Sequence, residues 1–333
     1  MKKSAKTTKW RILLASLISF SAVADDSILV VSYDVIRDYY KQYNPLYIQA
    51  YQQQHQARLN IAQSFGGASK QAIAVRNGLP ADVVTLNQQN DVDLLAESGL
   101  VAPDWQQRYP NQAIPFSSVT VFLVRKGNPK QIHDWNDLAQ QGVSVIFANP
   151  KTSGNGRYAY LSALGYAKQQ YHTETQVHDF MRKLLKNIPI FDAGARAASI
   201  TFTQRQIGDV LVTPENEAGL AAHALGADQF EVVYPSYSAS VDVFVAEVTK
   251  NTTRHKNSQT AQDFIASLWQ DTAQRVAAEN YFRPSNPTIL SEYQVRFPSV
   301  KTFNINQVFG DWATINQQHF ADGALFDQLY LSQ

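Results

Sequence analysis

The stretch Val143-Ser-Val-Ile-Phe-Ala-Asn-Pro-Lys-Thr-Ser-Gly-Asn-Gly156 decides the fold class of this chain. Four of its first five residues are apolar, which is typical of a buried strand. Residues 156–169 have the length and composition of a helix, and a loop of small and polar residues joins the two. A strand that runs through such a loop into a helix is the unit of parallel α/β sheets. We therefore expect an α/β protein.

The same alternation of strand and helix precedes this stretch. Short apolar runs predict strands at 28–32, 59–62 and 81–85. Helical patterns follow them at 34–56, 69–77 and 91–98. Gly78 and Gly99 stand where the last two helices should end.

A second block of strands and helices begins near residue 116. Further strands are expected at 119–125, 209–212, 230–233 and 241–245. Further helices are expected at 135–140, 175–186, 201–206 and 261–278. The length suggests two domains. We predict two α/β lobes, with residues 25–115 and 240–333 in lobe I and residues 116–239 in lobe II.

Residues 1–24 have the composition of a secretory signal peptide. Residues 2–11 carry five basic side chains and no acidic one, and Ile12–Phe20 is a short apolar run. Ser21–Ala24 then ends in small residues, so cleavage is expected after Ala24. The apolar run is too short to span a bilayer, which disfavours a membrane anchor.

Removing this segment makes the protein mildly acidic. The full chain has 29 Lys and Arg and 28 Asp and Glu. Losing five basic side chains leaves a net charge of about −4, which gives no general attraction for nucleic acid. There is no cysteine, so disulfides, thiol nucleophiles and thiolate metal ligands are excluded. No metal or cofactor is expected.

Loops rich in Gly, Ala, Ser and Thr open several of the expected helices. They span residues 64–69, 149–156 and 192–198. Each follows a strand or extended segment, where open α/β sheets bind ligands. The free N–H groups and the dipole at a helix N-terminus favour an anion. Several such loops in one cleft would bind an anion without a formal positive charge.

Ordinary helix capping is the alternative for each loop taken alone. A phosphate P-loop is excluded, because no Gly-Lys-Ser/Thr follows at the required spacing. It is the combination of three such loops in one secreted chain that favours a ligand.

Longer motifs make the sequence recognisable. They include 122–130 (Phe-Leu-Val-Arg-Lys-Gly-Asn-Pro-Lys), 149–154 (Asn-Pro-Lys-Thr-Ser-Gly), 194–196 (Gly-Ala-Arg) and 281–284 (Tyr-Phe-Arg-Pro). With them, the whole mature chain resembles the periplasmic sulfate- and thiosulfate-binding proteins of bacterial uptake systems, and residues 149–155 are nearer the thiosulfate branch. The resemblance implies a periplasmic-binding-protein type II fold, with a ligand cleft between two lobes. It also implies a periplasmic monomer that gives its anion to a membrane ABC permease.

The resemblance also implies a set of ligand-binding residues. The backbone N–H groups of Asp34, Gly154, Asn155 and Ala195 would donate to the anion. Ser153 would donate from its hydroxyl and its backbone. Arg196 would brace the loop beside the site. Because a fully ionised oxyanion needs only donors, such a site rejects a protonated phosphate.

Two positions depart from the family pattern. Ala68 stands where the family has a serine hydroxyl, and Pro214 stands where sulfate binders have a tryptophan. Neither side chain can donate a hydrogen bond. Ser69 could supply a hydroxyl beside Ala68, and Thr213 could do so beside Pro214. The departures suggest a bulkier or less symmetric ligand, such as thiosulfate or an organosulfur oxyanion.

Two other classes of function are alternatives to anion binding for import. An ester hydrolase is disfavoured, because none of the seven histidines has metal-binding spacing and no Gly-x-Ser-x-Gly motif occurs. A clamshell receptor for a membrane sensor stays open as an alternative, because it and an importer would both recognise the closed protein.

Overall fold

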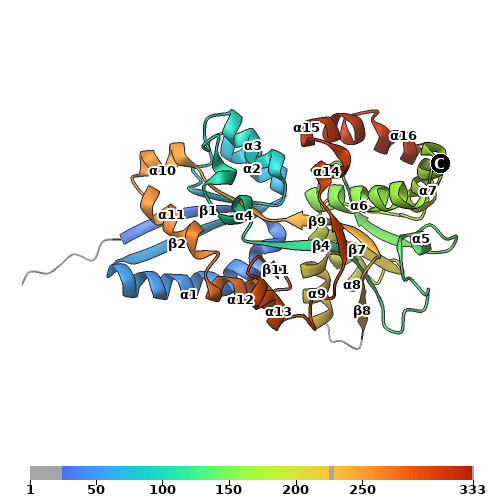
Figure 1. Ribbon diagram of the computed structural model, residues 1–333, viewed down its shortest axis with the longest axis horizontal. Helices are drawn as coiled ribbons and strands as arrows, with labels where there is room; N and C mark the ends of the chain where they lie inside the picture. The colour runs from blue at the N-terminus through green and yellow to red at the C-terminus, as the bar shows by residue number, and fades with distance from the viewer. Residues whose placement is uncertain (1–24, 225–228, 332–333) are drawn as a thin grey trace, which may run out of the picture.

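The protein forms two α/β lobes that lie side by side (Figure 1). The structure is a computed structural model that describes residues 25–224 and 229–331. The predicted signal peptide, residues 1–24, lies outside the described residues. The expected α/β class is confirmed.

Lobe I is built on a four-stranded sheet with the order β10-β3-β1-β2. Its strands are β1 (Asp25–Tyr33), β2 (Arg58–Gly66), β3 (Val83–Leu86) and β10 (Phe244–Glu247). β1 pairs in parallel with both β2 and β3, whereas β10 runs antiparallel to β3. The carboxyl ends of the three parallel strands therefore meet at one edge of the sheet.

Helices cover this sheet and bury apolar faces against it. They are η1 (Asp34–Ile36), α1 (Arg37–His55), α2 (Ala68–Arg76), α3 (Gln89–Glu97), η2 (Trp105–Gln107), α4 (Pro110–Ala113), α10 (Thr249–His255), α11 (Ser258–Ser267), α12 (Asp271–Glu279) and α13 (Pro287–Glu292). Tyrosines recur every four residues along α1 from Tyr39 to Tyr51 and are buried, which fits the 3.6-residue period of a helix facing a core. Tyr40 fixes α1 to the sheet through a 2.6 Å hydrogen bond with Thr85 of β3.

Lobe II is built on a larger sheet with the order β12-β9-β4-β7-β5-β6. Its strands are β4 (Phe116–Arg125), β5 (Val145–Ala148), β6 (Phe191–Asp192), β7 (Val210–Pro214), β9 (Tyr237–Asp242) and β12 (Lys301–Phe303), with β8 (Phe230–Val233) and β11 (Arg283–Pro284) also paired with β4. β5 is parallel to β6 and β7. The loops after β5, β6 and β7 thus leave the sheet at a common edge.

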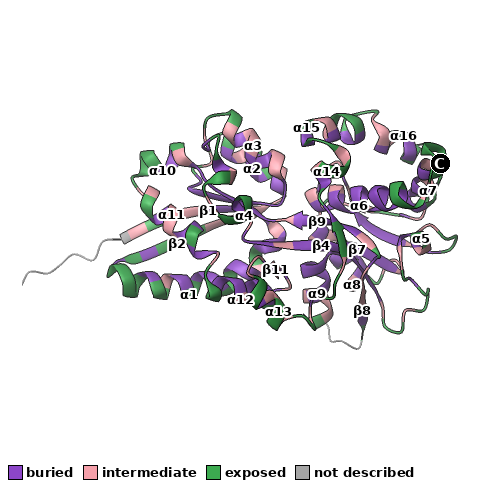
Figure 2. Cartoon of the chain, in the orientation of Figure 1, coloured by how far each residue is buried: buried purple, intermediate pink, exposed green. Residues whose placement is uncertain are grey.

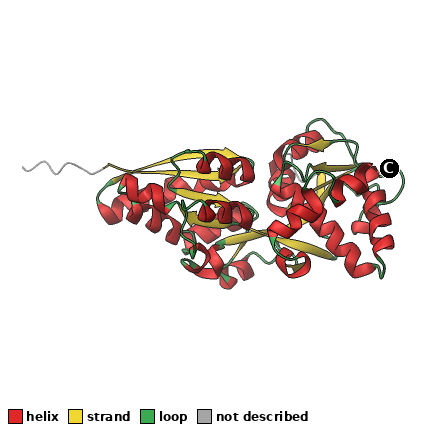
Figure 3. Ribbon diagram, turned by 90° about the horizontal axis from the view of Figure 1, so that it is seen from above, coloured by secondary structure: helices red, strands yellow, loops and turns green. Residues whose placement is uncertain are grey.

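The helices of lobe II complete the layers seen from above in Figure 3. They are α5 (Trp135–Leu138), α6 (Gly154–Gln170), α7 (Glu174–Lys186), α8 (Ala195–Thr203), α9 (Glu215–Ala224), α14 (Ile305–Phe309), α15 (Trp312–Ile315), η3 (Asn316–Phe320) and α16 (Leu325–Leu331). Figure 2 shows α6 mostly in the colour of buried residues. α6 is buried along most of its length.

The structure differs from the predicted elements where the chain changes lobes. The predicted single strand 241–245 is two strands in two sheets: β9 ends at Asp242 in lobe II and β10 begins at Phe244 in lobe I. The predicted helix 261–278 is likewise two helices, α11 and α12. The strand-like pattern of residues 241–245 does not show at which residue the chain leaves one sheet and enters the other.

The C-terminal segment also lies elsewhere than expected. The sequence placed residues 240–333 in lobe I, but the described part of the segment from Lys301 onward packs on lobe II. β12 pairs with β9, and Trp312, Ile315 and Phe326 join the core around α6 and α7. The two aromatic side chains pack against Tyr158 and Tyr160 of α6. The rest of the predicted lobe division stays a prediction.

Candidate functional site

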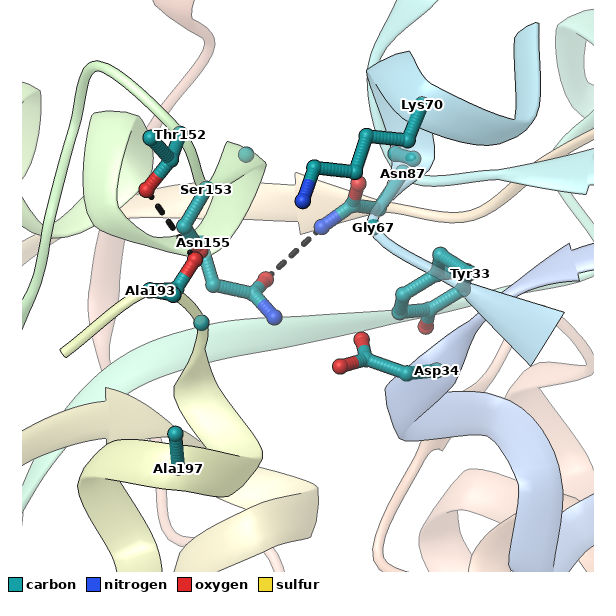
Figure 4. Close-up of a pocket in the computed structure, with 13 residues that line it drawn as sticks. Tyr33, Asp34, Gly67, Lys70, Asn87, Thr152, Ser153, Asn155, Ala193 and Ala197 are labelled. Carbon is teal, nitrogen blue, oxygen red and sulfur yellow. Dashed lines mark hydrogen bonds between the residues drawn. The ribbon is translucent and has the colours of Figure 1, made fainter. Parts of the chain in front are cut away.

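A small pocket lies between the two lobes, with residues of both lobes on its walls (Figure 4). Its volume is about 230 Å³. This is below the range of pockets for drug-sized ligands, so the pocket suits a small solute. The lining residues are Tyr33, Asp34, Gly67, Ala68, Lys70, Asn87, Thr152, Ser153, Gly154, Asn155, Ala193, Gly194 and Ala197.

The carboxyl ends of strands supply most of this lining. β1, β2 and β3 of lobe I end at Tyr33, Gly66 and Leu86, and the lining residues follow at once. β5 and β6 of lobe II do the same from the other side. The N-termini of α2, α6 and α8 all open beside the pocket, so the three segments singled out in the sequence surround one space. The predicted bounds of the third are wrong, because α8 spans Ala195–Thr203 and includes most of the predicted loop 192–198.

The N-terminus of α6 presents free donors to this space. Ser153 is the N-cap, and its Oγ accepts a 3.2 Å hydrogen bond from the Gly156 N–H. Among the described residues, no partner is recorded for the N–H groups of Gly154 and Asn155, as expected at the first positions of a helix. The Ser153 N–H is not free, because it donates to the Asn149 carbonyl at 2.9 Å. Only the hydroxyl of Ser153 remains as a donor.

The first turn of α2 lies on the opposite wall. Gly67 is its N-cap, and Ala68 lines the pocket with a side chain that cannot donate. Ser69 does not line the pocket; its hydroxyl donates to Asp91 Oδ2 at 3.2 Å. Burial raises the pKa of Asp91 to about 6, and the Ser69 hydrogen bond opposes that rise. The hydroxyl is therefore committed within lobe I and does not replace the one missing at Ala68.

The first turn of α8 brings backbone groups and one ion pair to the site. Gly194 is its N-cap and lines the pocket, whereas Ala195 is buried against the core of lobe I and is not among the lining residues. Arg196 is also off the lining. Its guanidinium lies 2.7 Å from Asp38 of lobe I and 3.5 Å from Glu217 of lobe II. Arg196 thus joins the two lobes beside the pocket.

Pro214 lies away from the pocket lining. It is the last residue of β7, pairs with Thr120 of β4 and is buried in the sheet. The Oγ1 of neighbouring Thr213 is buried without a hydrogen-bond partner and does not line the pocket either. The structure therefore gives no sign that a missing ring at this position enlarges the pocket.

Two charged side chains also reach the pocket, and the sequence predicted neither of them there. Asp34 extends its carboxyl toward the space, and Lys70 extends its ammonium group from α2 (Figure 4). Burial raises the pKa of the Asp34 carboxyl, and backbone N–H groups and Arg196 oppose that rise. A dianion in the pocket would be repelled by an ionised Asp34 and attracted by Lys70.

A second carboxyl lies just behind the pocket wall. Glu217 is only 1% exposed, and burial raises its pKa to about 7, against the opposing effect of Arg196. Its Oε2 accepts a 3.2 Å hydrogen bond from the Ser199 hydroxyl, while Oε1 has no hydrogen-bond partner. The charge near the site therefore changes close to neutral pH.

Cross-lobe contacts show that the lobes are closed on each other. Asn87 of lobe I donates to Asn155 Oδ1 at 2.7 Å, and Arg157 of α6 donates to Gln88 at 3.3 Å. A Cβ added to Gly154 would lie 2.9 Å from Asn87 Oδ1, so any larger residue here would force the Asn87 side chain to shift. The pocket is formed by closure and not by either lobe alone.

Sequence reasoning missed several of the residues around the site. Asn87 directly follows a buried strand, so the rule that ligands bind at the carboxyl ends of strands could have found it. Lys70 gave no such signal, because a lysine in the first turn of a helix is usually solvated. Tyr33 was missed as well, whereas Gly67, Thr152, Ala193, Gly194 and Ala197 lie within the three predicted loops but were not named individually.

Metal and membrane sites find no support in residues 25–224 and 229–331. No group of three or more His, Asp or Glu there could hold a metal ion. None of the described helices is long and apolar enough to cross a membrane.

Comparison with known proteins identifies the family. Residues 29–283 match the family described as bacterial extracellular solute-binding protein. The chain is 48% identical to a thiosulfate-binding protein from Pseudomonas aeruginosa, over 96% of this chain and 98% of that protein. It is 44% identical to a sulfate-binding protein from Escherichia coli K12, over 96% and 98%. Among solved structures, the sulfate-binding protein SubI from Mycobacterium tuberculosis H37Rv matches with a TM-score of 0.76 and 29% identity, over 89% of this chain and 99% of that one.

These similarities confirm the predicted two-lobe binding-protein fold, the expectation of a binding protein over an enzyme, and the location outside the cytoplasm. The chain belongs to the bacterial extracellular solute-binding proteins.

Proposed function

We propose that this protein captures a tetrahedral sulfur oxyanion, thiosulfate or sulfate, between its lobes and delivers it to an ABC-type membrane importer. The observation that carries the proposal is the N-terminus of α6. It points the unpaired N–H groups of Gly154 and Asn155 at a small pocket that both lobes close. Such a helix terminus is an anion site without further charged groups.

The kind of anion follows from the mixture of donors and acceptors on the walls. Amide N–H groups and the Ser153 hydroxyl supply donors, and Lys70 adds a positive charge at the edge. Donors satisfy a fully ionised oxyanion, whereas a protonated ligand also needs an acceptor, which the Asp34 carboxyl offers on the pocket wall. The relatives with full-length similarity are named for thiosulfate or sulfate, which supports the same class of ligand here.

The residues around the pocket have different proposed roles. Asp34 contributes a backbone N–H group, together with Gly154 and Asn155 of α6, all three of which line the pocket. Ala195 lies off the lining, and its expected role rests on its N–H at the first position of α8 beside Gly194. Ser153 contributes its hydroxyl only, because its own N–H is bonded to Asn149. Arg196 acts from outside the pocket by holding the lobes together through Asp38.

Two of the nine residues expected from the sequence receive no ligand role. The hydroxyl of Ser69 is bonded to Asp91, and Pro214 is buried in the sheet. Ala68 lines the wall but can supply only contact surface. A bulkier organosulfur ligand is therefore not favoured by this pocket.

Calorimetry on the purified mature chain tests the binding step. We expect thiosulfate and sulfate to bind. Gly154→Ala is the matched variant, because its added Cβ would collide with Asn87 only when the lobes close. It should weaken oxyanion binding without unfolding the protein. Failure of the native protein to bind any sulfur oxyanion would refute the proposal.

Transport tests the delivery step and separates import from a receptor role. The protein should restore oxyanion uptake to vesicles that contain the cognate permease and its ATPase. Binding without any stimulation of uptake would favour a clamshell receptor for a membrane sensor.

A further inference from the structure

The side chain of Asn155 holds a hydrogen-bond donor at the pocket. Asn155 is buried and lines the pocket, and its Oδ1 accepts the 2.7 Å hydrogen bond from Asn87 Nδ2 (Figure 4). Because Oδ1 is engaged, the other end of the amide, Nδ2, faces the pocket. Among the described residues, no hydrogen bond from this Nδ2 is recorded, and it is not among the atoms sealed from solvent. Its N–H groups are therefore available to a ligand.

The orientation of this amide depends on both lobes. Asn155 lies in the first turn of α6 in lobe II, and Asn87 follows β3 in lobe I. The bond that fixes Oδ1 can form only where the lobes meet. In the closed protein this bond fixes the amide as a donor aimed at the pocket.

The opposite orientation would present the wrong group to an anion. If Asn155 gave its Nδ2 to Asn87, its Oδ1 would face the ligand, and two oxygens would meet without a proton between them. Asn87 Oδ1 is buried without a hydrogen-bond partner. The pair therefore leaves one oxygen unpaired in lobe I and presents a donor to the pocket. A fully ionised oxyanion selects this arrangement.

We propose that the Asn155 side-chain amide donates directly to the bound oxyanion and that Asn87 is its positioning residue. This inference rests on the proposed oxyanion binding and adds a donor beyond the backbone groups of α6. It also supplies, from lobe II, a donor that Ala68 cannot give from lobe I. The pair thereby links recognition of an unprotonated ligand to closure of the lobes.

Two substitutions at one position separate a ligand donor from a simple latch between lobes. Asn155→Ala keeps the backbone N–H but removes the side-chain donor, and should weaken thiosulfate and sulfate binding by about 10- to 100-fold. Asn155→Asp keeps the shape and the acceptor for Asn87 Nδ2 but faces the anion with an oxygen. At pH 8 it should bind at least as weakly as Asn155→Ala. Binding by Asn155→Asp that is tighter than that of Asn155→Ala would mean that the amide serves only as a latch, and would overturn the inference.

Asn306→Ala is the matched control. Asn306 also bonds across the lobes, to Gln89 at 3.1 Å, but it does not line the pocket. Its replacement should weaken binding several-fold less than Asn155→Ala, and equal losses would overturn the inference. Asn87→Ala should weaken binding in the native protein but not in the Asn155→Ala background, because a positioning residue acts only through its partner. A native protein that binds no sulfur oxyanion would instead refute the proposed function itself.

Discussion

Glu217 is a buried carboxyl whose charge should control the stability of lobe II near neutral pH. Burial raises its pKa from 4.5 to about 7, although Arg196 lies 3.5 Å away. The folded protein therefore holds a proton on Glu217 that the unfolded chain releases between about pH 4.5 and 7. The change corresponds to about 3 kcal/mol of unfolding free energy, which is present at low pH and is lost as the pH rises through this window.

Glu217→Gln is the informative substitution. Glutamine has the same shape, carries no charge and keeps an acceptor for the Ser199 hydroxyl. It should leave the stability nearly unchanged at pH 4.5 and raise it by about 3 kcal/mol at pH 8. Urea unfolding of the ligand-free protein between pH 4.5 and 8 measures this difference.

An exposed carboxyl provides the control. Glu292 pairs with Arg275 at the surface, which lowers its pKa, so Glu292→Gln should not stabilise the protein at pH 8. If Glu217→Gln is no more stable than the native protein at pH 8, the ionised pair with Arg196 outweighs burial, and the reasoning is refuted.

Further substitutions test the loops around the pocket. Gly156→Ala would place a Cβ 2.4 Å from the Ala148 carbonyl oxygen, so it should lower the thermal unfolding temperature; an unchanged temperature would contradict this packing. Asp34→Asn removes a carboxylate from the pocket, so oxyanion affinity at pH 8 should rise in calorimetry. Native affinity should itself increase as the pH falls toward the raised pKa of Asp34, and the variant should lack the part of that increase due to Asp34. Arg196→Met breaks the ion pair with Asp38 and should speed oxyanion release about tenfold in stopped-flow traces, whereas unchanged release would exclude a role in closure.

Most of the sheet and helix framework could be predicted from the sequence, because it depends on local periodicity. The strand before Asp34 and the loop-to-helix unit at 149–156 have clear apolar runs and helix-opening residues. The crossing near Val243 could not be predicted, because the strand-like pattern of residues 241–245 continues from one sheet into the other. Nor could the sequence show on which lobe the residues from Lys301 onward pack, because that depends on which lobe has an uncovered helix face.

The candidate site, too, could be predicted only in part. Loop composition predicted that 149–156 and 192–198 would face a common space, since such loops leave parallel sheets at one edge. The sequence could not show that the Ser69 hydroxyl turns to Asp91, because a one-residue step around a helix changes which way a side chain points. Nor could it reveal the contact between Asn87 and Asn155, which depends on the distance between closed lobes.

The position of the chain's last segment has a consequence for biosynthesis. β12 and the helices that follow it, from Lys301 to Leu331, cover one side of α6 and complete the second hydrophobic core. That core cannot be finished while these residues are still in the ribosome or the translocation channel. The second lobe should therefore reach its native state, and the protein lose its competence for export, only after residues 301–331 have emerged.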